Sequence, residues 1–177
     1  FKELFKEELD KNRQYVREVQ SDTDVEMLIP DEYISSIQER LNLYTQLDGL
    51  ETEEELQKFE EAMKDRFGAV PEPVYELFDG LRLRWVCRRL GFERLILKNN
   101  KLRCYFVENP QSLFYESAQF QATLLFVQKE GARRGLSFKK TNRHFMLIKD
   151  GVRGLQDALR VLRKLDEKVE QEAVPAE

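Results

Sequence analysis

The spacing of hydrophobic residues changes at Gly91, and this change limits the folds open to the chain. Before Gly91, apolar residues recur every three or four positions, as they do along the buried side of a helix. After it, two pairs of short apolar segments flank turn-forming residues, which is typical of hairpins. A chain of 177 residues has room for one ordinary domain. The sequence therefore predicts an α+β fold, with several helices packed on a small, mainly antiparallel β-sheet.

The segment before Gly91 predicts a short strand over residues 25–29 and then three helices. Asp31 is expected to cap the first helix. Its apolar stripe comprises Ile34, Ile37, Leu41 and Tyr44. Thr52 and Glu55 have the spacing of a capping box at the start of the second helix, and Gly68 suits a left-handed cap at its end.

The third helix is expected from Pro71 to Leu90. Gly80 lies inside it and costs roughly 1 kcal/mol against Ala, which indicates close packing at that point. After Gly91, Asn99 and Asn100 suit the two-residue turn of a hairpin. The remaining elements are a helix over residues 117–133, a second hairpin over residues 136–149 and a last helix over residues 152–169.

Acidic and basic residues are divided unevenly along the chain, although the net charge is only −4. Residues 1–79 hold nine Lys and Arg against 22 Asp and Glu, whereas residues 80–177 hold 20 against 11. The two halves either neutralise each other across the fold or leave a polarised surface that docks on a charged partner.

Few residues have the spacing of a catalytic or metal site. The single histidine, His144, has no nucleophile or orienting carboxylate in a recognisable motif, so a surface or edge-strand position is favoured. Cys87 and Cys104 lie in apolar surroundings without CxxC spacing and are interpreted as buried thiols of a cytosolic protein. The acidic run at residues 53–55 is explained by helix-start carboxylates rather than by metal ligands. We expect a chain with no catalytic residues, no metal site and no cofactor of its own.

A basic stretch between residues 82 and 103 offers an alternative function. Its cations are opposed only by Glu93 and could follow a phosphate backbone as a DNA-binding module. They are Arg82, Arg84, Arg88, Arg89, Arg94, Lys98, Lys101 and Arg103. The interleaved apolar residues fit core positions, so a solvated or acid-paired face is favoured over nucleic acid, with a protein partner as the third possibility.

Three segments resemble one known family. These are IPDEYI at residues 29–34, RLNLY at residues 40–44 and DRFG at residues 65–68, followed by Pro71. Their order and spacing resemble the TRCF domain, the C-terminal domain of the bacterial transcription-repair coupling factors of the Mfd family. The resemblance covers about residues 24–166. It implies a connecting helix or linker over residues 1–23, following a translocase module, then the domain itself over residues 24–170 and a frayed tail over residues 171–177.

Members of this family are large cytoplasmic proteins, and the resemblance implies what this chain does within one. The parent is an ATP-driven DNA translocase that dislodges stalled RNA polymerase and recruits excision repair; ATP and magnesium belong to its motor domains. The C-terminal domain is a non-catalytic, autoinhibitory clamp. It packs on the N-terminal UvrB-like module of the same polypeptide, masks the surface that binds UvrA and restrains the motor. No membrane partner is implied.

The clamp would explain the DRFG segment, in which a charged pair and an aromatic crowd the end of a helix. Asp65 and Arg66 could offer a carboxylate and a planar guanidinium to a partner surface, with Phe67 as the packing anchor of the turn. The alternative is that both charges are solvated and the segment only ends the helix. With the resemblance, an interdomain interface at Asp65, Arg66 and Phe67 is the favoured interpretation.

Overall fold

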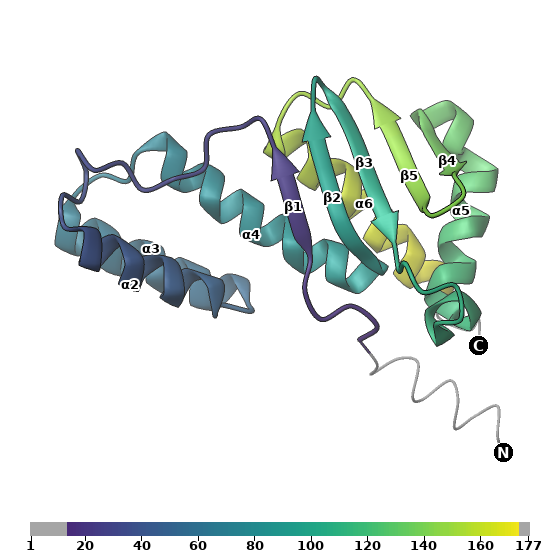
Figure 1. The fold of residues 1–177 in the computed structure, drawn as a ribbon, viewed down its shortest axis with the longest axis horizontal. Coiled ribbons are helices and arrows are strands. Elements are labelled where there is room, and N and C mark those ends of the chain that lie inside the picture. Colours follow the sequence, from purple (N-terminus) through teal and green to yellow (C-terminus); the bar gives the residue numbers. More distant parts are fainter. Residues whose placement is uncertain (1–13, 174–177) are drawn as a thin grey trace, which may run out of the picture.

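The structure, a computed structural model that describes residues 14–173, consists of a β-sheet covered by helices on one face and a helical extension at its side (Figure 1). In chain order the elements are β1 (Gln20–Thr23), α2 (Ile37–Asp48), α3 (Glu53–Phe67), α4 (Glu72–Leu90), β2 (Phe92–Lys98), β3 (Lys101–Phe106), the 3-10 helix η1 (Leu113–Glu116), α5 (Ala118–Arg134), β4 (Leu136–Lys140), β5 (Phe145–Asp150) and α6 (Leu155–Ala173).

The sheet has five strands in the order β1-β2-β3-β5-β4. Only β1 and β2 run parallel, and the other pairs are antiparallel. Asn99 and Asn100 join β2 to β3 with φ of 54° and 60°, the positive values that a tight hairpin turn of this kind needs. The predicted α+β class, with helices on a mainly antiparallel sheet, is confirmed.

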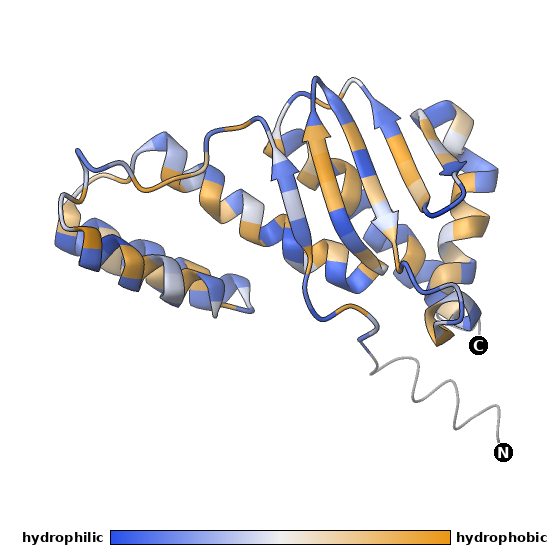
Figure 2. Cartoon of the chain, viewed as in Figure 1, coloured by the Kyte–Doolittle hydropathy of each residue, from blue (hydrophilic) through white to orange (hydrophobic). Residues whose placement is uncertain are grey.

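Helix α4 belongs to two hydrophobic clusters at once. Val74, Phe78 and Leu81 on its first half pack with α2, α3 and residues 29–34. On its second half, Val86 and Leu90 pack into the larger cluster between the sheet and helices α5 and α6. Figure 1 shows the consequence: α2 and α3 lie beside the start of α4 and away from the sheet. Figure 2 shows hydrophobic residues along α4 and through β2 and β5.

Two glycines allow the close contacts that fix α4. A Cβ on Gly80 would lie 2.8 Å from the sulfur of Met27, so the expected close packing occurs against the extended segment before α2 rather than against another helix. Gly91 ends the helix in the left-handed conformation, and a Cβ there would lie 2.1 Å from Cε1 of Phe114. The buried ring of Phe114 therefore ties η1 to the junction of α4 and β2.

The start of the chain departs from the sequence-based expectations. Residues 25–29 form no strand; the strand is β1, which adds to the edge of the sheet beside β2. A connecting helix or linker is expected over residues 1–23. Residues 14–19 are not helical, and residues 1–13 lie outside the described residues. The four residues of β1 precede the domain boundary expected at residue 24, and α6 continues to Ala173, into the expected tail.

The expected cap of the first helix is wrong, and its apolar stripe is wrong in part: Ile34 and Tyr44 pack in the smaller cluster, but Ile37 and Leu41 do not. Residues 31–33 form a turn, and the N-cap of α2 is Ser36, whose hydroxyl accepts a hydrogen bond from the Glu39 amide at 3.2 Å. The buried residues of α2 are Leu43 and Leu47, which lie on another side of the helix than the expected stripe. Ile37 and Leu41, expected inside, are 67% and 54% exposed. The Pro30–Asp31 pair was mistaken for a helix start because proline and aspartate serve turns equally well.

Of the other local signals, the cap at Thr52 is confirmed, but the conformation expected of Gly68 and the start of the last helix are not. The Thr52 hydroxyl accepts from the Glu55 amide at 3.2 Å and also bonds the Glu55 carboxylate at 3.1 Å, which confirms a capped start for α3. At the end of α3, Gly68 has φ of 89° with an extended ψ of −165°, so it terminates the helix without the expected left-handed conformation. The last helix begins at Leu155, three residues after the expected start.

Replacing Gly91 by Ala should destabilise the protein more than replacing Gly151 by Ala. Both glycines have positive φ, 86° and 75°, so each variant forces a side chain into a backbone region that costs about 1–2 kcal/mol. Only Gly91→Ala also meets the Phe114 ring, since nothing lies within 4 Å of a Cβ at Gly151. We expect the free energy of unfolding of Gly91→Ala, measured in urea, to fall by about 1–3 kcal/mol more than that of Gly151→Ala. Equal losses would mean that the ring moves aside at no cost.

Glu76→Gln should stabilise the protein at neutral pH. Burial, helped by the charges of Asp79 and Glu72, raises the pKa of Glu76. Its Oε2 is also buried without a hydrogen-bond partner among the described residues. A raised pKa means that the ionised carboxylate costs native-state stability above that pKa. The gain from Gln should therefore be full at pH 7 and disappear as the pH falls towards 4.5, the ordinary value.

Urea unfolding at several pH values measures this gain. The exposed Glu61→Gln on α3 is the control and should show no such trend. A gain from Glu76→Gln that stays constant down to acidic pH would contradict the argument, because it would not come from ionisation.

Candidate interaction surfaces

The end of α3 is held by an aromatic contact and a hydrogen bond to the segment before α2. The Tyr33 hydroxyl donates to the Gly68 carbonyl at 2.8 Å, and the Tyr33 and Phe67 rings lie 6.0 Å apart between centroids. The Gly68 amide donates to the Lys64 carbonyl at 2.9 Å and closes the helix. Phe67 is half-buried against the smaller hydrophobic cluster. Its contacts fit the packing role that the sequence suggested for it.

Arg66 is oriented by two neighbours, whereas Asp65 is exposed and has no ion-pair partner among the described residues. The Arg66 guanidinium lies 4.8 Å from the centre of the Phe67 ring and forms an ion pair with Glu39 on α2. Its side chain nevertheless remains 62% exposed. Asp65 is exposed, and no described residue forms an ion pair with it. The α3 end therefore presents one positioned cation beside one unpaired carboxylate.

The exposed flank of α2 adds apolar area to the same helical pair. Ile37 and Leu41 are one turn apart and share a side of α2. Leu43 and Leu47 occupy the buried side, and the Tyr44 hydroxyl accepts from the Ile29 amide at 2.7 Å. Sequence reasoning missed this flank because it placed Ile37 and Leu41 in the core. The signal that could have found it is Ser36, a stronger N-cap candidate than a residue following proline.

The structure divides the predicted basic stretch into two groups. On α4, Arg82 pairs with Glu53 at 2.7 Å and with Asp79 at 2.9 Å. Arg84 pairs with Asp48 at 3.0 Å and Arg89 with Asp166 at 2.9 Å. Arg88 is half-buried, and its Nε has no hydrogen-bond partner among the described residues. The α4 members therefore serve the fold.

The other four members lie on the strands of the β2–β3 hairpin. Arg94 and Lys98 belong to β2, and Lys101 and Arg103 belong to β3. Lys98 pairs with Asp22 at 2.9 Å and Lys101 approaches Asp150 at 3.9 Å. The eight cations therefore do not form one face. Only the four on β2 and β3 lie together as candidates for nucleic acid, because Arg82, Arg84 and Arg89 on α4 are ion-paired within the fold.

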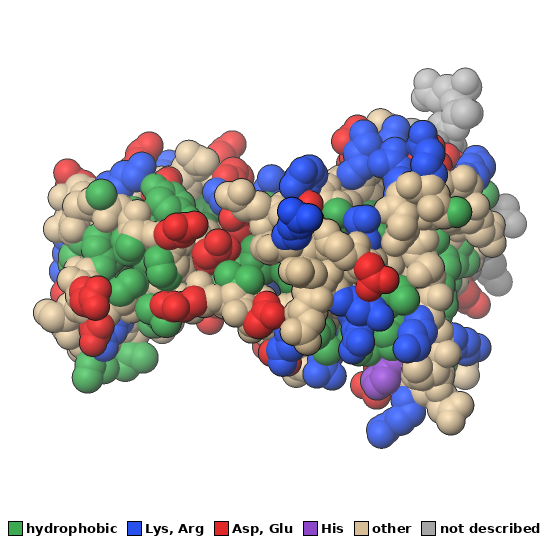
Figure 3. Space-filling model, turned by 90° about the horizontal axis from the view of Figure 1, so that it is seen from above, with side chains coloured by type: hydrophobic (Ala, Val, Ile, Leu, Met, Phe, Trp, Pro, Cys, Tyr) green, Lys and Arg blue, Asp and Glu red, His purple; other side chains and the backbone are tan. Residues whose placement is uncertain are grey.

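Charge of opposite sign gathers at the two ends of the molecule. In Figure 3, acidic side chains are prominent on the helical end, and lysines and arginines cluster on the end that carries the sheet. The sequence asymmetry therefore survives folding as a polarised surface, although pairs such as Arg82–Glu53 neutralise part of it where the ends meet. In that pair the Arg82 hydrogen bond lowers the pKa of Glu53. This confirms a structural role for Glu53, at the start of α3.

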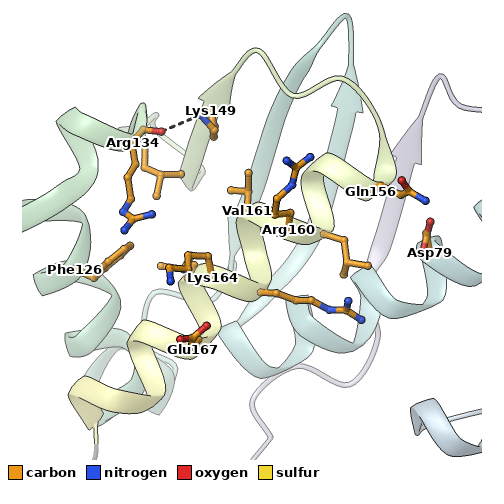
Figure 4. A pocket seen from close by; sticks show the side chains of 13 residues that line it. Asp79, Phe126, Arg134, Lys149, Gln156, Arg160, Val161, Lys164 and Glu167 are labelled. Carbon is orange, nitrogen blue, oxygen red and sulfur yellow. Dashed lines mark hydrogen bonds between the residues drawn. The ribbon is translucent and has the colours of Figure 1, made fainter.

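A groove of about 810 Å³ runs along α6, where Figure 4 shows side chains from α4, α5 and α6 around it. Its charged lining is mainly basic, with Arg134, Lys149, Arg160, Arg163 and Lys164 against Asp79 and Glu167. Lys149 donates to the Arg134 carbonyl at 2.9 Å, and Arg160 donates to Asp157 at 2.9 Å. The groove brings no nucleophile and base together among the described residues.

The remaining candidates for chemistry are structural. Cys87 and Cys104 are buried and free, and burial raises the pKa of both thiols, which makes them unreactive. His144 lies next to the Tyr105 ring at 5.3 Å, at the start of β5. Within residues 14–173, no group of three or more His, Cys, Asp or Glu side chains is placed to hold a metal ion. None of the described helices is both long and apolar enough to span a bilayer.

Comparisons with known proteins agree with the resemblance seen in the sequence. The transcription-repair-coupling factor of Escherichia coli (strain K12) is 36% identical over 77 residues, which are 41% of this chain and 7% of that protein. The corresponding factor of Mycobacterium bovis is 35% identical over 126 residues, which are 67% of this chain and 10% of that protein. The chain thus spans a tenth or less of the relatives it matches.

A solved structure shares the fold. The crystal structure of the C-terminal domain of a transcription-repair coupling factor superposes with a TM-score of 0.63 at 19% identity, covering 87% of this chain and 94% of that one. The family model for the TRCF domain matches residues 23–117, which is more than half of the chain. The match includes α2, α3 and α4, with the DRFG segment at the end of α3. The chain belongs to the TRCF domain family.

Proposed function

We propose that this chain is the non-catalytic regulatory domain of a transcription-repair coupling factor. It packs on the N-terminal UvrB-like module of its own polypeptide, masks the surface that binds UvrA and restrains the ATP-dependent DNA translocase until the protein meets stalled RNA polymerase. ATP and magnesium are used by the motor domains of the cytoplasmic parent. This chain supplies contacts rather than chemistry.

One observation carries the proposal: Asp65 and Arg66 are exposed at the end of α3, while Tyr33 packs against Phe67 and donates a hydrogen bond to Gly68. An interface that must open needs contacts that hold without an obligate apolar core. Charge-assisted hydrogen bonds meet this need because they are strong when dry and are replaced by water when the surfaces part. The Arg66 guanidinium is already oriented, so less side-chain entropy is lost when a partner binds.

The energy that such a clamp requires is modest. Suppressing activity a hundredfold needs about 2.7 kcal/mol in favour of the closed state, since each factor of ten is about 1.4 kcal/mol. One or two charge-assisted hydrogen bonds supply about 1.5–3 kcal/mol each. Polymerase would then release the clamp by binding the open state more tightly. The α3 end is therefore large enough for the task only if a partner desolvates it.

Removing the charged pair should weaken binding to the separately expressed N-terminal module. We expect the Asp65→Ala/Arg66→Ala variant to raise Kd at least about tenfold, because charge-assisted bonds of about 1.5–3 kcal/mol are lost. Calorimetry or biolayer interferometry measures Kd. The fold should survive, because Arg66 is 62% exposed in its ion pair with the half-buried Glu39, and pairs near the surface contribute about 0–1 kcal/mol.

Asp150→Ala is the matched control, since Asp150 is 85% exposed at the end of β5 and belongs to the sheet. It should leave Kd unchanged. If the double variant binds as wild type does, Asp65 and Arg66 only terminate the helix. If the wild-type complex is too weak to detect, joining the two pieces with a flexible linker increases the fraction bound, because the effective concentration is then about millimolar.

The apolar flank of α2 should contribute to the same complex. Ile37→Gln/Leu41→Gln keeps helix-forming residues and removes two exposed side chains. We expect at least about tenfold weaker binding to the module, because burying one such side chain contributes about 1.5–3 kcal/mol when complete and each factor of ten is about 1.4 kcal/mol. The melting temperature should not fall. Leu125→Gln, 39% exposed on α5, is the control. Unchanged Kd in the double variant would place this flank outside the interface.

A further inference from the structure

One face of the sheet is open. Helices α4, α5 and α6 all lie behind the sheet as Figure 1 shows it, and no described helix covers the front. In β2 and β3, buried side chains that point towards the helices, such as Leu95 and Cys104, alternate with more exposed ones. In β5 both Met146 and Leu147 are buried, so Met146 forms the floor of the open face. The open face consists of these alternate side chains, because successive residues of a strand point to opposite sides.

Strand pairing arranges the open face in rows, and two of them lie next to the row of Lys98, Lys101 and Asp150 at the end of the hairpin. Arg94, Tyr105, Met146 and Lys139 are successive partners across β2, β3, β5 and β4, so their side chains lie side by side. In the next row Ile96, Arg103, Ile148 and Ser137 are partners in the same way. The two rows combine apolar side chains with three cations. The chain order gives no hint of this, since Arg94 and Lys139 come from distant segments.

Three cations on this face lack an acidic partner. Lys98 and Lys101 are paired with Asp22 and Asp150 at the end of the hairpin. Arg94, Arg103 and Lys139, in contrast, form no ion pair with any residue from 14 to 173. Arg103 and Lys139 are exposed. These three positive charges are available to an anionic ligand.

Two rings lie among the cations. The Arg94 guanidinium is 5.5 Å from the centre of the half-buried Tyr105 ring, and the His144 ring meets Tyr105 edge-on at 5.3 Å. Bases stack on tyrosine rings and on guanidinium planes. A duplex keeps its bases inside and could use only the charges, whereas a single strand can use the charges and the rings together.

We propose that this open sheet face is a binding surface for single-stranded DNA. Arg94, Arg103 and Lys139 hold phosphates, and Tyr105 stacks a base. The site excludes Arg82, Arg84 and Arg89 of the predicted stretch and includes Tyr105 and Lys139, which that stretch did not contain. The choice of DNA over RNA rests on the proposed function. The assignment to a polynucleotide rests only on the cations and rings of this face.

The test measures binding of the whole 177-residue chain to labelled oligothymidine by fluorescence anisotropy. A length of about 20 nucleotides exceeds the ~4–16 that one small single-strand-binding fold covers. We expect Arg94→Gln/Arg103→Gln to weaken binding at least about tenfold. The slope of log K against log salt should fall by about 1.4, which is about 0.7 for each lost phosphate contact. Tyr105→Leu should weaken binding about 5- to 100-fold with an unchanged slope.

Arg133→Gln/Arg160→Gln is the matched control. It removes the same charge from arginines that are 72% and 75% exposed on α5 and α6, on the other side of the sheet. This control variant should change Kd by less than about twofold, since charges away from a site mainly affect long-range attraction. Equal weakening by both double variants would overturn the proposal, because the attraction would then be unspecific. Melting curves of every variant must match wild type, and Arg94→Lys/Arg103→Lys, which keeps the charge, should restore the slope.

Competing ligands separate the alternatives. Tighter binding of oligouridine would assign the face to RNA, tighter binding of duplex DNA would remove the stacking role, and competition by polyglutamate alone would indicate an acidic protein partner. Each of these results, or no binding at low salt, overturns the proposal. Asp65→Ala/Arg66→Ala should bind DNA as wild type does, so this test and the clamp test fail independently.

Discussion

Helix α4 is the constraint on which the rest of the structure depends, because its two halves complete two different hydrophobic clusters. Phe78 and Leu81 close the helical cluster, and Val86 and Leu90 close the cluster under the sheet. A helix buried along most of its length cannot rotate without disrupting both. Met27 against Gly80 and Phe114 against Gly91 fix its position at two further points. The helical end and the sheet are therefore held by one rigid element.

This arrangement separates two kinds of surface. The α3 end carries a carboxylate and an oriented guanidinium beside an apolar flank, whereas the open sheet face carries cations and rings. Between the two surfaces, Arg82 forms an ion pair with Glu53 of α3 and Arg84 with Asp48 of α2, so these two cations are neutralised within the fold. A partner at one end would meet mainly acidic charge and a partner at the other mainly basic charge. The polarity of the molecule thus favours different ligands at its two ends.

Local signals were predictable where a short segment determines its own conformation. Asn99 and Asn100 form the expected turn, and Thr52 caps α3, because turn and cap preferences depend on neighbouring residues only. Asp31 failed as a cap since Ser36, five residues later, competes for the same role. The resemblance identified the family and pointed to Asp65 and Arg66. It could not show that Glu39 forms an ion pair with Arg66, because that pair joins two different helices, α2 and α3.

The fold class and the positions of most helices and hairpins follow from local patterns in the sequence, and membership of the TRCF domain family follows from a few ordered segments. Tertiary structure alone decided which charges are free. Arg82 and Arg94 look equivalent along the chain, yet one is paired with Glu53 and Asp79 and the other stands over Tyr105 on an open sheet. The reason is physical: a charge is neutralised by whatever folding brings within a few ångströms, and that neighbour comes from a distant part of the chain.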